Sequence, residues 1–277
     1  MRGMNTNAAT VTTRTAPVGR LLRDWRERRR LTQLDLACDA EISTRHLSFV
    51  ETGRAKPSRE MLLHLSELLD VPLRERNALL VAAGFAPVFR ERALDDPDMA
   101  KARDALQIVL SAHEPYPATV VDRHWNLRMA NRAAHRLLAG IPPEKLATPV
   151  NVLRLSLDPD GLAKHIVNLG EWRTHLLARL RAQVATSGDA GLRALYEELA
   201  ALPPLPGETR TPASTPFPDV VVRLEMETPL GRLALFSTIT VFGTPVDVTL
   251  SELALEAFYP ADEATATLLR AMAAADR

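Results

Sequence analysis

Apolar residues in the first third of the chain recur at the spacing of amphipathic helices. After Pro17, a residue suited to the first turn of a helix, apolar side chains follow at i, i+3, i+4 and i+7: Val18, Leu21, Leu22 and Trp25. Four further apolar runs predict helices that begin at Thr32, Ser43, Ser58 and Leu73. Five helices joined by short loops in about 70 residues predict an all-α bundle over residues 17–89.

The second and third of these helices are joined as a helix-turn-helix. Thr32 is the expected N-cap of the second helix, and Asp35 at N3 completes a capping box. Ser43 is the expected N-cap of the third helix, which Gly53 terminates. Glu41 stands in the turn where many such motifs have glycine, so we expect a positive φ there, at a cost of roughly 1 kcal/mol.

The third helix has one face for the core and one for a partner. Leu47 and Val50 share the inward face, whereas Thr44, Arg45, Ser48 and Phe49 share another face and point away. Such a helix suits the major groove of double-stranded DNA. Arg45 is expected to bond guanine in bidentate fashion or to contact phosphate, and Phe49 to contact thymine methyls or join the core. The residues expected at DNA are Gln33, Ser43, Thr44, Arg45, His46, Ser48, Phe49, Arg54 and Lys56.

Residues 98–277 show a mixed pattern after a charged, non-periodic segment at 90–97, where we place the domain boundary. A helix through Leu106 and Leu110, a strand, the polar turn 122–126, a second strand and an Asn131-capped helix predict the opening of a PAS-like fold. A helical middle and a connector at 203–218 with six prolines follow. The expected later elements are strands at 219–227, 232–241 and 246–255 and a helix at 262–274. The second domain is therefore predicted to be α+β, with about five antiparallel strands.

Several segments resemble one family of regulators. Residues 32–58 resemble the XRE family of helix-turn-helix domains, and residues 43–58 resemble its MmyB-like members more narrowly. His-Glu-Pro-Tyr-Pro (113–117), Asp-Arg-His-Trp-Asn (122–126) and Thr-Pro-Leu-Gly-Arg-Leu (228–233) resemble that family's second domain. The resemblance implies that Gln33 braces against the DNA backbone and that Glu51 bonds within the domain, to an arginine of the first helix. It also implies that the second domain binds a fatty-acid-like molecule.

Charge is unevenly distributed along a chain of zero net charge. Residues 1–90 carry 15 Lys+Arg against 10 Asp+Glu, and residues 91–277 carry 19 against 24. A basic N-terminal segment followed by an acidic remainder is typical of a DNA-binding domain joined to one that does not bind DNA. Chance variation in charge is the alternative explanation.

Cysteine content and apolar run length exclude other classes. Cys38 is the single cysteine, which excludes disulfides within the chain. Because the second domain contains no cysteine, it cannot be a photosensor that bonds its flavin through a cysteine. We expect it to be a packed, inert thiol in its helix. No run reaches membrane-spanning length, and residues 1–16 lack the apolar core of a signal peptide. We expect a disordered tail at 1–16 and a cytoplasmic protein without membrane contact.

The second domain offers no recognisable catalytic pattern. His124, His165 and His175, with Asp122 and Glu171, lack metal-ligand spacing, and no nucleophile elbow or phosphate loop occurs. We therefore expect no enzyme, no metal and no cofactor. Large apolar residues from several elements could form either a packed core or a ligand pocket. The pocket candidates are Trp125, Met129, Trp172, Leu176, Phe236 and Phe242.

Together these patterns predict a one-component transcription regulator. Its first domain is expected to bind operator DNA as a homodimer, and its second to bind a small apolar ligand that changes DNA affinity. One alternative is a second domain that serves only dimerisation, which a fully packed core would favour. Another is an enzyme fused to a DNA-binding head, which a polar pocket with converging histidine and carboxylate would favour.

Overall fold

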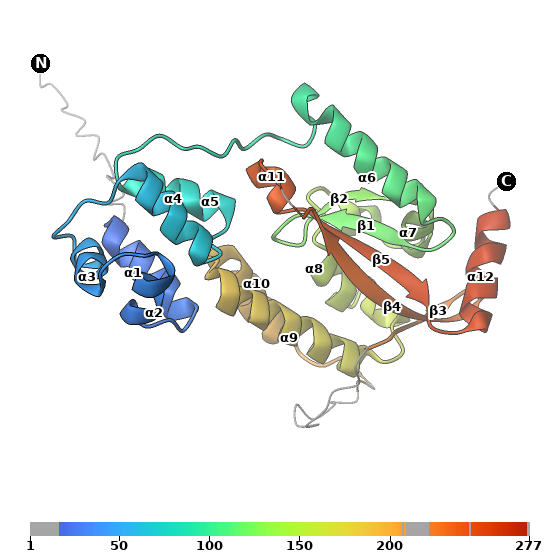
Figure 1. The fold of residues 1–277 in the computed structure, drawn as a ribbon. Coiled ribbons are helices and arrows are strands. Elements are labelled where there is room, and N and C mark those ends of the chain that lie inside the picture. Colours follow the sequence, from blue (N-terminus) through green and yellow to red (C-terminus); the bar gives the residue numbers. More distant parts are fainter. Residues whose placement is uncertain (1–16, 207, 209–221, 244, 276–277) are drawn as a thin grey trace, which may run out of the picture. The chain divides into compact units, whose positions relative to one another are not determined.

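The computed structural model describes residues 17–206, 208, 222–243 and 245–275 (Figure 1). The expected tail at 1–16 lies outside these ranges, as does most of the expected connector at 203–218. The chain divides into two compact units, Met1–Phe89 and Arg90–Arg277.

The described part of the first unit is a bundle of five short helices, which confirms the all-α prediction. They are α1 (Val18–Arg28), α2 (Gln33–Asp39), α3 (Thr44–Glu51), α4 (Arg59–Leu68) and α5 (Leu73–Ala82). Leu22, Leu36, Leu47 and Val50 have no exposed surface and join the helices around one core.

Close contact between α1 and α3 depends on Gly19. A Cβ atom at this position would lie 2.3 Å from the carbonyl oxygen of Val50 and 2.5 Å from that of Glu51. Both oxygens belong to the backbone of α3, so they cannot move away as the end of a flexible side chain could. The absence of a side chain at Gly19 therefore sets how closely the two helices approach.

The prediction for Cys38 is wrong, because its side chain is exposed. Leu36, Ala37 and Ala40 carry the buried side of α2. Cys38 lies on the opposite side of the helix, where the 3.6-residue period places it.

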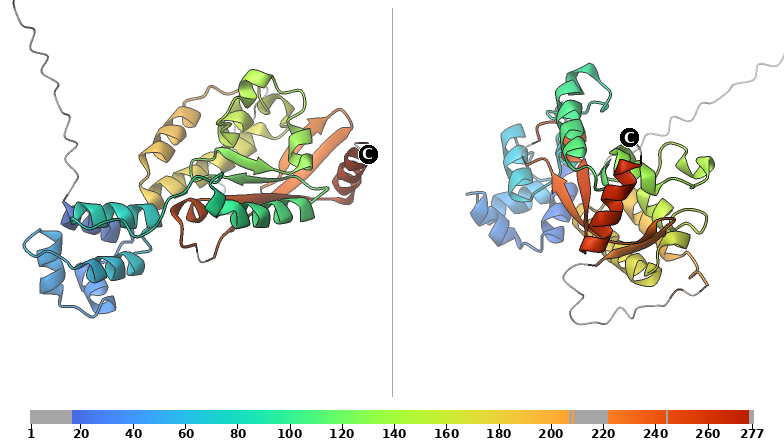
Figure 2. Two further views of the ribbon diagram at one scale, coloured as in Figure 1. Left: turned by 90° about the horizontal axis from the view of Figure 1, so that it is seen from above. Right: turned by 90° about the vertical axis from the view of Figure 1, so that its right-hand side faces the viewer.

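The second unit is an α+β domain, as expected (Figures 1 and 2). Its helices are α6 (Ala100–Ala112), α7 (Arg132–Leu137), α8 (Val152–Leu157), α9 (Leu169–Ser187), α10 (Ala190–Ala200), α11 (Val248–Ser251) and α12 (Glu263–Ala274). Short 3-10 turns lie at Pro97–Met99, Pro143–Leu146 and Ala163–His165. The strands are β1 (Ala118–Val121), β2 (Leu127–Ala130), β3 (Leu224–Thr228), β4 (Gly231–Val241) and β5 (Ala254–Pro260).

All strand pairs among the described residues are antiparallel, in the order β2-β1-β5-β4-β3. One face of the sheet is covered by α6, whose Leu106 and Leu110 pack with Val120 and Leu255. Leucines of α8, α9 and α10 pack on the other face, against residues such as Leu235. In Figure 2, the green helix α6 and the yellow helices α9 and α10 lie on opposite sides of the sheet. The described residues form five strands, as expected.

The predicted strand at 246–255 is wrong. Residues Val248–Ser251 form a short helix, and β5 begins only at Ala254. Asp247 is buried and accepts a hydrogen bond from the Thr249 N–H, which favours a helical turn over a strand. Strand β3 begins at Leu224, whereas the prediction began at 219, outside the described residues.

The charged segment after Phe89 is bonded to the second unit. Arg90 accepts a hydrogen bond at its carbonyl oxygen from the Val248 N–H (2.8 Å). Arg92 lies 3.1 Å from the Asp247 carboxylate and accepts a hydrogen bond from the Thr249 hydroxyl at its carbonyl oxygen. The backbone from Arg90 to Arg92 is thus held against the start of α11.

Candidate DNA-binding surface and ligand pocket

Local hydrogen bonds fix the helix-turn-helix as expected. The Asp35 N–H donates to the Thr32 hydroxyl (3.1 Å), and the Thr32 N–H donates to the Asp35 carboxylate (2.8 Å), which completes the capping box. Glu41 has a φ of 54°, as expected for the turn. The Ser43 hydroxyl accepts from the His46 N–H (3.1 Å) and so caps α3. The two helices of the motif therefore have defined starts.

A buried carboxylate ties α1, α2 and α3 together. Glu51 accepts from Arg26 Nε (2.7 Å) and Nη2 (3.0 Å), and from Gln33 Nε2 (2.7 Å). The expected bond from Glu51 to an arginine of the first helix is confirmed. Gln33 thus uses its amide nitrogen within the domain, and its contact with the DNA backbone stays a prediction.

The inward face of α3 is as predicted, whereas the predicted outward face is only partly exposed. Leu47 and Val50 are buried, whereas Arg45 is exposed. Thr44, His46 and Ser48 are half-buried, and Arg54 and Lys56, in the loop after α3, are exposed.

Phe49 is half-buried and lies beneath two arginines. The guanidinium carbon of Arg45 is 5.3 Å from its ring centroid, and that of Arg54 is 5.9 Å away. Within residues 17–89, all of which the structure describes, Arg45, Arg54 and Lys56 make no ion pair. Their positive charge is therefore not offset inside the unit.

The second unit contains a cavity of about 100 Å³ between the sheet and helices α7, α8 and α9. Its lining is mainly apolar and includes Leu127, Leu137, Trp172, Leu176, Met226 and Phe258. Thr119, Ser156 and Glu256 are the polar residues at its wall. No histidine belongs to the described lining, and its single carboxylate is that of Glu256.

Of the six predicted pocket residues, the structure brings Trp172 and Leu176 together at this cavity. Trp125 is buried in the same core layer but outside the cavity wall. Met129 and Phe242 pack on the α6 side of the sheet. Phe236 stacks on Tyr259, with ring centroids 5.3 Å apart. On strands β2 and β4, alternation places Met129 and Phe236 on the α6 face of the sheet, away from the cavity.

A charged pair that the sequence analysis missed borders the cavity. Glu256 is buried on β5 and accepts from Arg179 Nη1 of α9 (3.1 Å) and from the Ser237 hydroxyl (3.0 Å). His175, one turn before Arg179, stacks on Trp172 at 5.4 Å. Burial, and next the positive charge of Arg179, lower the pKa of His175 below its ordinary value. Since Arg179 and Glu256 are far apart in sequence, no local pattern indicates the pair.

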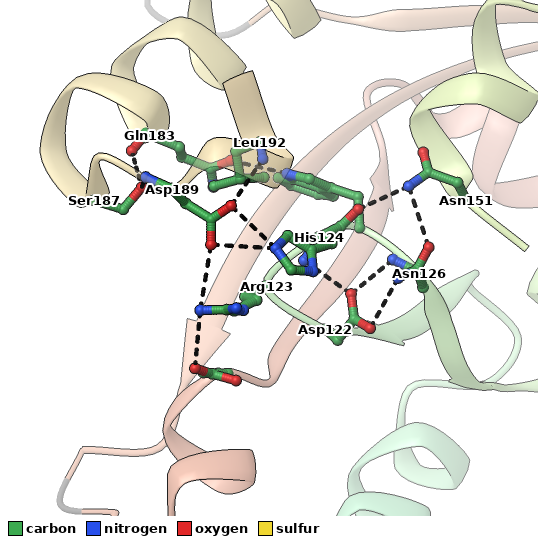
Figure 3. Close-up of polar contacts among 11 residues, drawn as sticks. Asp122, Arg123, His124, Asn126, Asn151, Gln183, Ser187, Asp189 and Leu192 are labelled. Carbon is green, nitrogen blue, oxygen red and sulfur yellow. Dashed lines mark hydrogen bonds and ion pairs between the residues drawn. The ribbon is translucent and has the colours of Figure 1, made fainter. Parts of the chain in front are cut away.

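The turn between β1 and β2 is bonded to the junction of α9 and α10 (Figure 3). His124 Nε2 lies 3.2 Å from both carboxylate oxygens of Asp189, and Arg123 Nη1 lies 3.2 Å from one of them. Trp125 adopts a φ of 67° and donates from its indole nitrogen to Gln183 (2.8 Å). Asp189 is also the N-cap of α10. These contacts hold the turn in place.

The same turn is organised internally by Asp122. Its carboxylate accepts from the backbone N–H groups of His124 and Asn126, both at 2.9 Å. Burial would raise the pKa of Asp122, but the hydrogen bonds from Asn126 and the charge of Arg128 outweigh it, so that the pKa is lowered. Neither Asp122 nor His124 belongs to the wall of the apolar cavity.

In the described part of the chain, no group of three or more His, Cys, Asp or Glu side chains is placed to hold a metal ion. No described helix is long and apolar enough to cross a membrane.

Comparison with known proteins gives two family matches. Residues 17–79 match the family model described as a helix-turn-helix domain, and residues 102–272 match the "MmyB-like transcription regulator ligand binding domain". No curated protein matches the chain. Among solved structures, one titled "Structure of an RNA-binding Light-Oxygen-Voltage Receptor" is similar, with 13% identity and a TM-score of 0.25. That match covers 96% of this chain, which spans 65% of the other chain.

The two matches follow each other along the chain as the two units do. The helix-turn-helix match falls within the first unit, and the ligand-binding match falls within the second. Since the latter spans more than half of the 277 residues, the chain belongs to the family of MmyB-like transcription regulators, with a helix-turn-helix domain before the ligand-binding domain.

Proposed function

We propose that the protein is a one-component regulator that binds a specific operator as a homodimer and responds to a fatty-acid-like ligand. Residues 17–89 would bind DNA, and residues 98–277, a PAS-like domain after the 90–97 segment, would bind the ligand. The observation that carries this proposal is the apolar cavity in the unit that matches a ligand-binding family. We infer no catalytic role, since no histidine belongs to the described cavity wall that contains Glu256.

The DNA side of the proposal is supported by the charge of the first unit. Arg45, Arg54 and Lys56 lie at α3 and the loop after it without an internal counter-charge. Phosphate groups attract such cations, and a guanidinium can also bond guanine in bidentate fashion. Gln33, Ser43, Thr44, His46, Ser48 and Phe49 are proposed to complete the surface.

The size of the cavity bears on how a ligand would act. Sites for drug-sized ligands enclose about 300–1,000 Å³, whereas this cavity has about 100 Å³. We therefore propose that a chain-like ligand widens the space between the sheet and α7, α8 and α9. Widening gives the ligand-bound state a different arrangement, which is the condition for a change in DNA affinity.

Filling the cavity tests this proposal. Medium-to-long-chain fatty acids are titrated into the full chain while tryptophan fluorescence is followed. Leu176→Phe should weaken binding at least tenfold, because Leu176 lines the cavity. Leu180→Phe is the matched control: it is a buried leucine of the same helix outside the cavity wall, and it should leave ligand affinity unchanged.

The rival, in which the second unit serves only dimerisation, gives a different result. It predicts no saturable change with any fatty acid. Equal effects of the two phenylalanine substitutions would show that the ligand binds elsewhere.

A further inference from the structure

We propose that Phe49 is a positioning residue, whose ring holds Arg45 and Arg54 in place for DNA. This inference rests on the proposed operator binding. It differs from a direct contact of Phe49 with thymine methyls, because two guanidinium groups of the protein itself lie over the ring.

The two arginines reach the ring by different local routes. Arg45 lies four residues before Phe49 on α3, so both side chains share one side of the helix. Arg54 comes from beyond the helix, where Gly53 has a φ of 74° and turns the chain back. The N–H groups of Arg54 (2.8 Å) and Ala55 (3.0 Å) both donate to the carbonyl oxygen of Phe49. These backbone bonds fix the loop beside the ring.

The charges around the ring indicate an anionic partner. Two guanidinium groups near one ring repel each other, and no carboxylate in residues 17–89 lies within ion-pair distance of either. Arg26, by contrast, is held by the carboxylate of Glu51. Phosphate and guanine offer the acceptors that a pair of free guanidinium groups requires.

Holding the arginines in advance lowers the entropy lost when DNA binds. A free arginine side chain has many rotamers, and a contact that already limits them reduces the loss on binding. An exposed cation–π contact corresponds to about two- to fivefold in affinity per arginine. We therefore expect Phe49→Leu to weaken operator binding by roughly five- to twentyfold.

The test uses an operator that the protein selects itself. The full-length wild-type chain is used to enrich a duplex from a random-sequence pool, and a scrambled duplex of equal composition is the reference. Phe49→Leu should lose affinity for the selected duplex, and Phe49→Tyr, which keeps the ring, should retain it within about twofold. Circular dichroism shows whether each variant folds. If Phe49→Leu does not fold, Phe49→Met is measured in its place.

The effect of Phe49→Leu in a variant that lacks both arginines then shows whether Phe49 positions them or contacts DNA itself. In Arg45→Ala/Arg54→Ala, the proposal predicts that Phe49→Leu has no further effect on the selected duplex. The same loss in both backgrounds would overturn the inference and leave the proposed function standing. A pool that enriches no sequence would overturn the proposed operator binding and this inference with it.

Discussion

Replacing Glu51 by alanine should destabilise the first unit severely. The Glu51 side chain is 1% exposed and that of Arg26 is 9% exposed, and they form two hydrogen bonds of 2.7 and 3.0 Å. Removing the carboxylate leaves Arg26 buried with a hydrogen bond from Nη1 to the Leu31 carbonyl oxygen and a long ion pair, 3.9 Å, with the exposed Glu27. It also removes the acceptor of Gln33. Breaking a buried pair from one side costs about 3–5 kcal/mol, a large part of the stability of a small domain.

Hydrogen–deuterium exchange of the full chain measures this loss within the first unit. Protection of the slowest amides in α1 and α3 should fall by roughly two to four orders of magnitude. Arg23→Ala is the control, because it breaks an exposed pair with Glu27, and it should leave protection unchanged. If Glu51→Ala lowers the protection of these amides no more than Arg23→Ala does, burial does not make the Glu51–Arg26 pair important for stability.

Further expected outcomes concern packing, pH and DNA binding. Gly19→Ala should destabilise the first unit by about 1–3 kcal/mol, measured by the same exchange, because the new Cβ meets the backbone of α3. The pKa of His175 is lowered by burial and by Arg179, so stability of the second unit should fall as pH drops through about 6.5. The melting temperature of His175→Gln should depend less on pH than that of the wild type. An unchanged pH dependence would show that His175 does not cause it. Arg45→Ala should abolish preference for the selected duplex over the scrambled one, whereas equal proportional losses would show a phosphate contact. Residues 1–90 alone should bind that duplex more weakly than the full chain, and equal affinity would contradict dimerisation by the second domain.

Features with a local cause could be predicted from the sequence. The capping box of Thr32 and Asp35 and the positive φ of Glu41 depend on residues within one turn. The inward face of α3 follows from the helical period through Leu47 and Val50. The same reasoning was wrong at Cys38, where the residue type suggested burial but the period of α2 places the side chain outside.

Features that depend on distant pairing could not be predicted. The register of β2 decides whether Met129 faces the cavity or α6, because a shift by one residue would turn its side chain to the other face of the sheet. The pairing of Arg179 with Glu256 requires α9 to cross β5, and nothing near either residue indicates this. Residues 248–251 form a helix because Asp247 caps it, although the apolar composition there resembles a strand.

In the proposed function, a ligand in the second unit changes DNA binding by the first. The most direct measurement is the affinity of the full chain for its selected duplex, with and without a saturating fatty acid that binds the second unit. We expect the affinity to change by about five- to 150-fold, and we expect Leu176→Phe to abolish this change and Leu180→Phe to preserve it. Saturable ligand binding with an unchanged duplex affinity would contradict the proposed function.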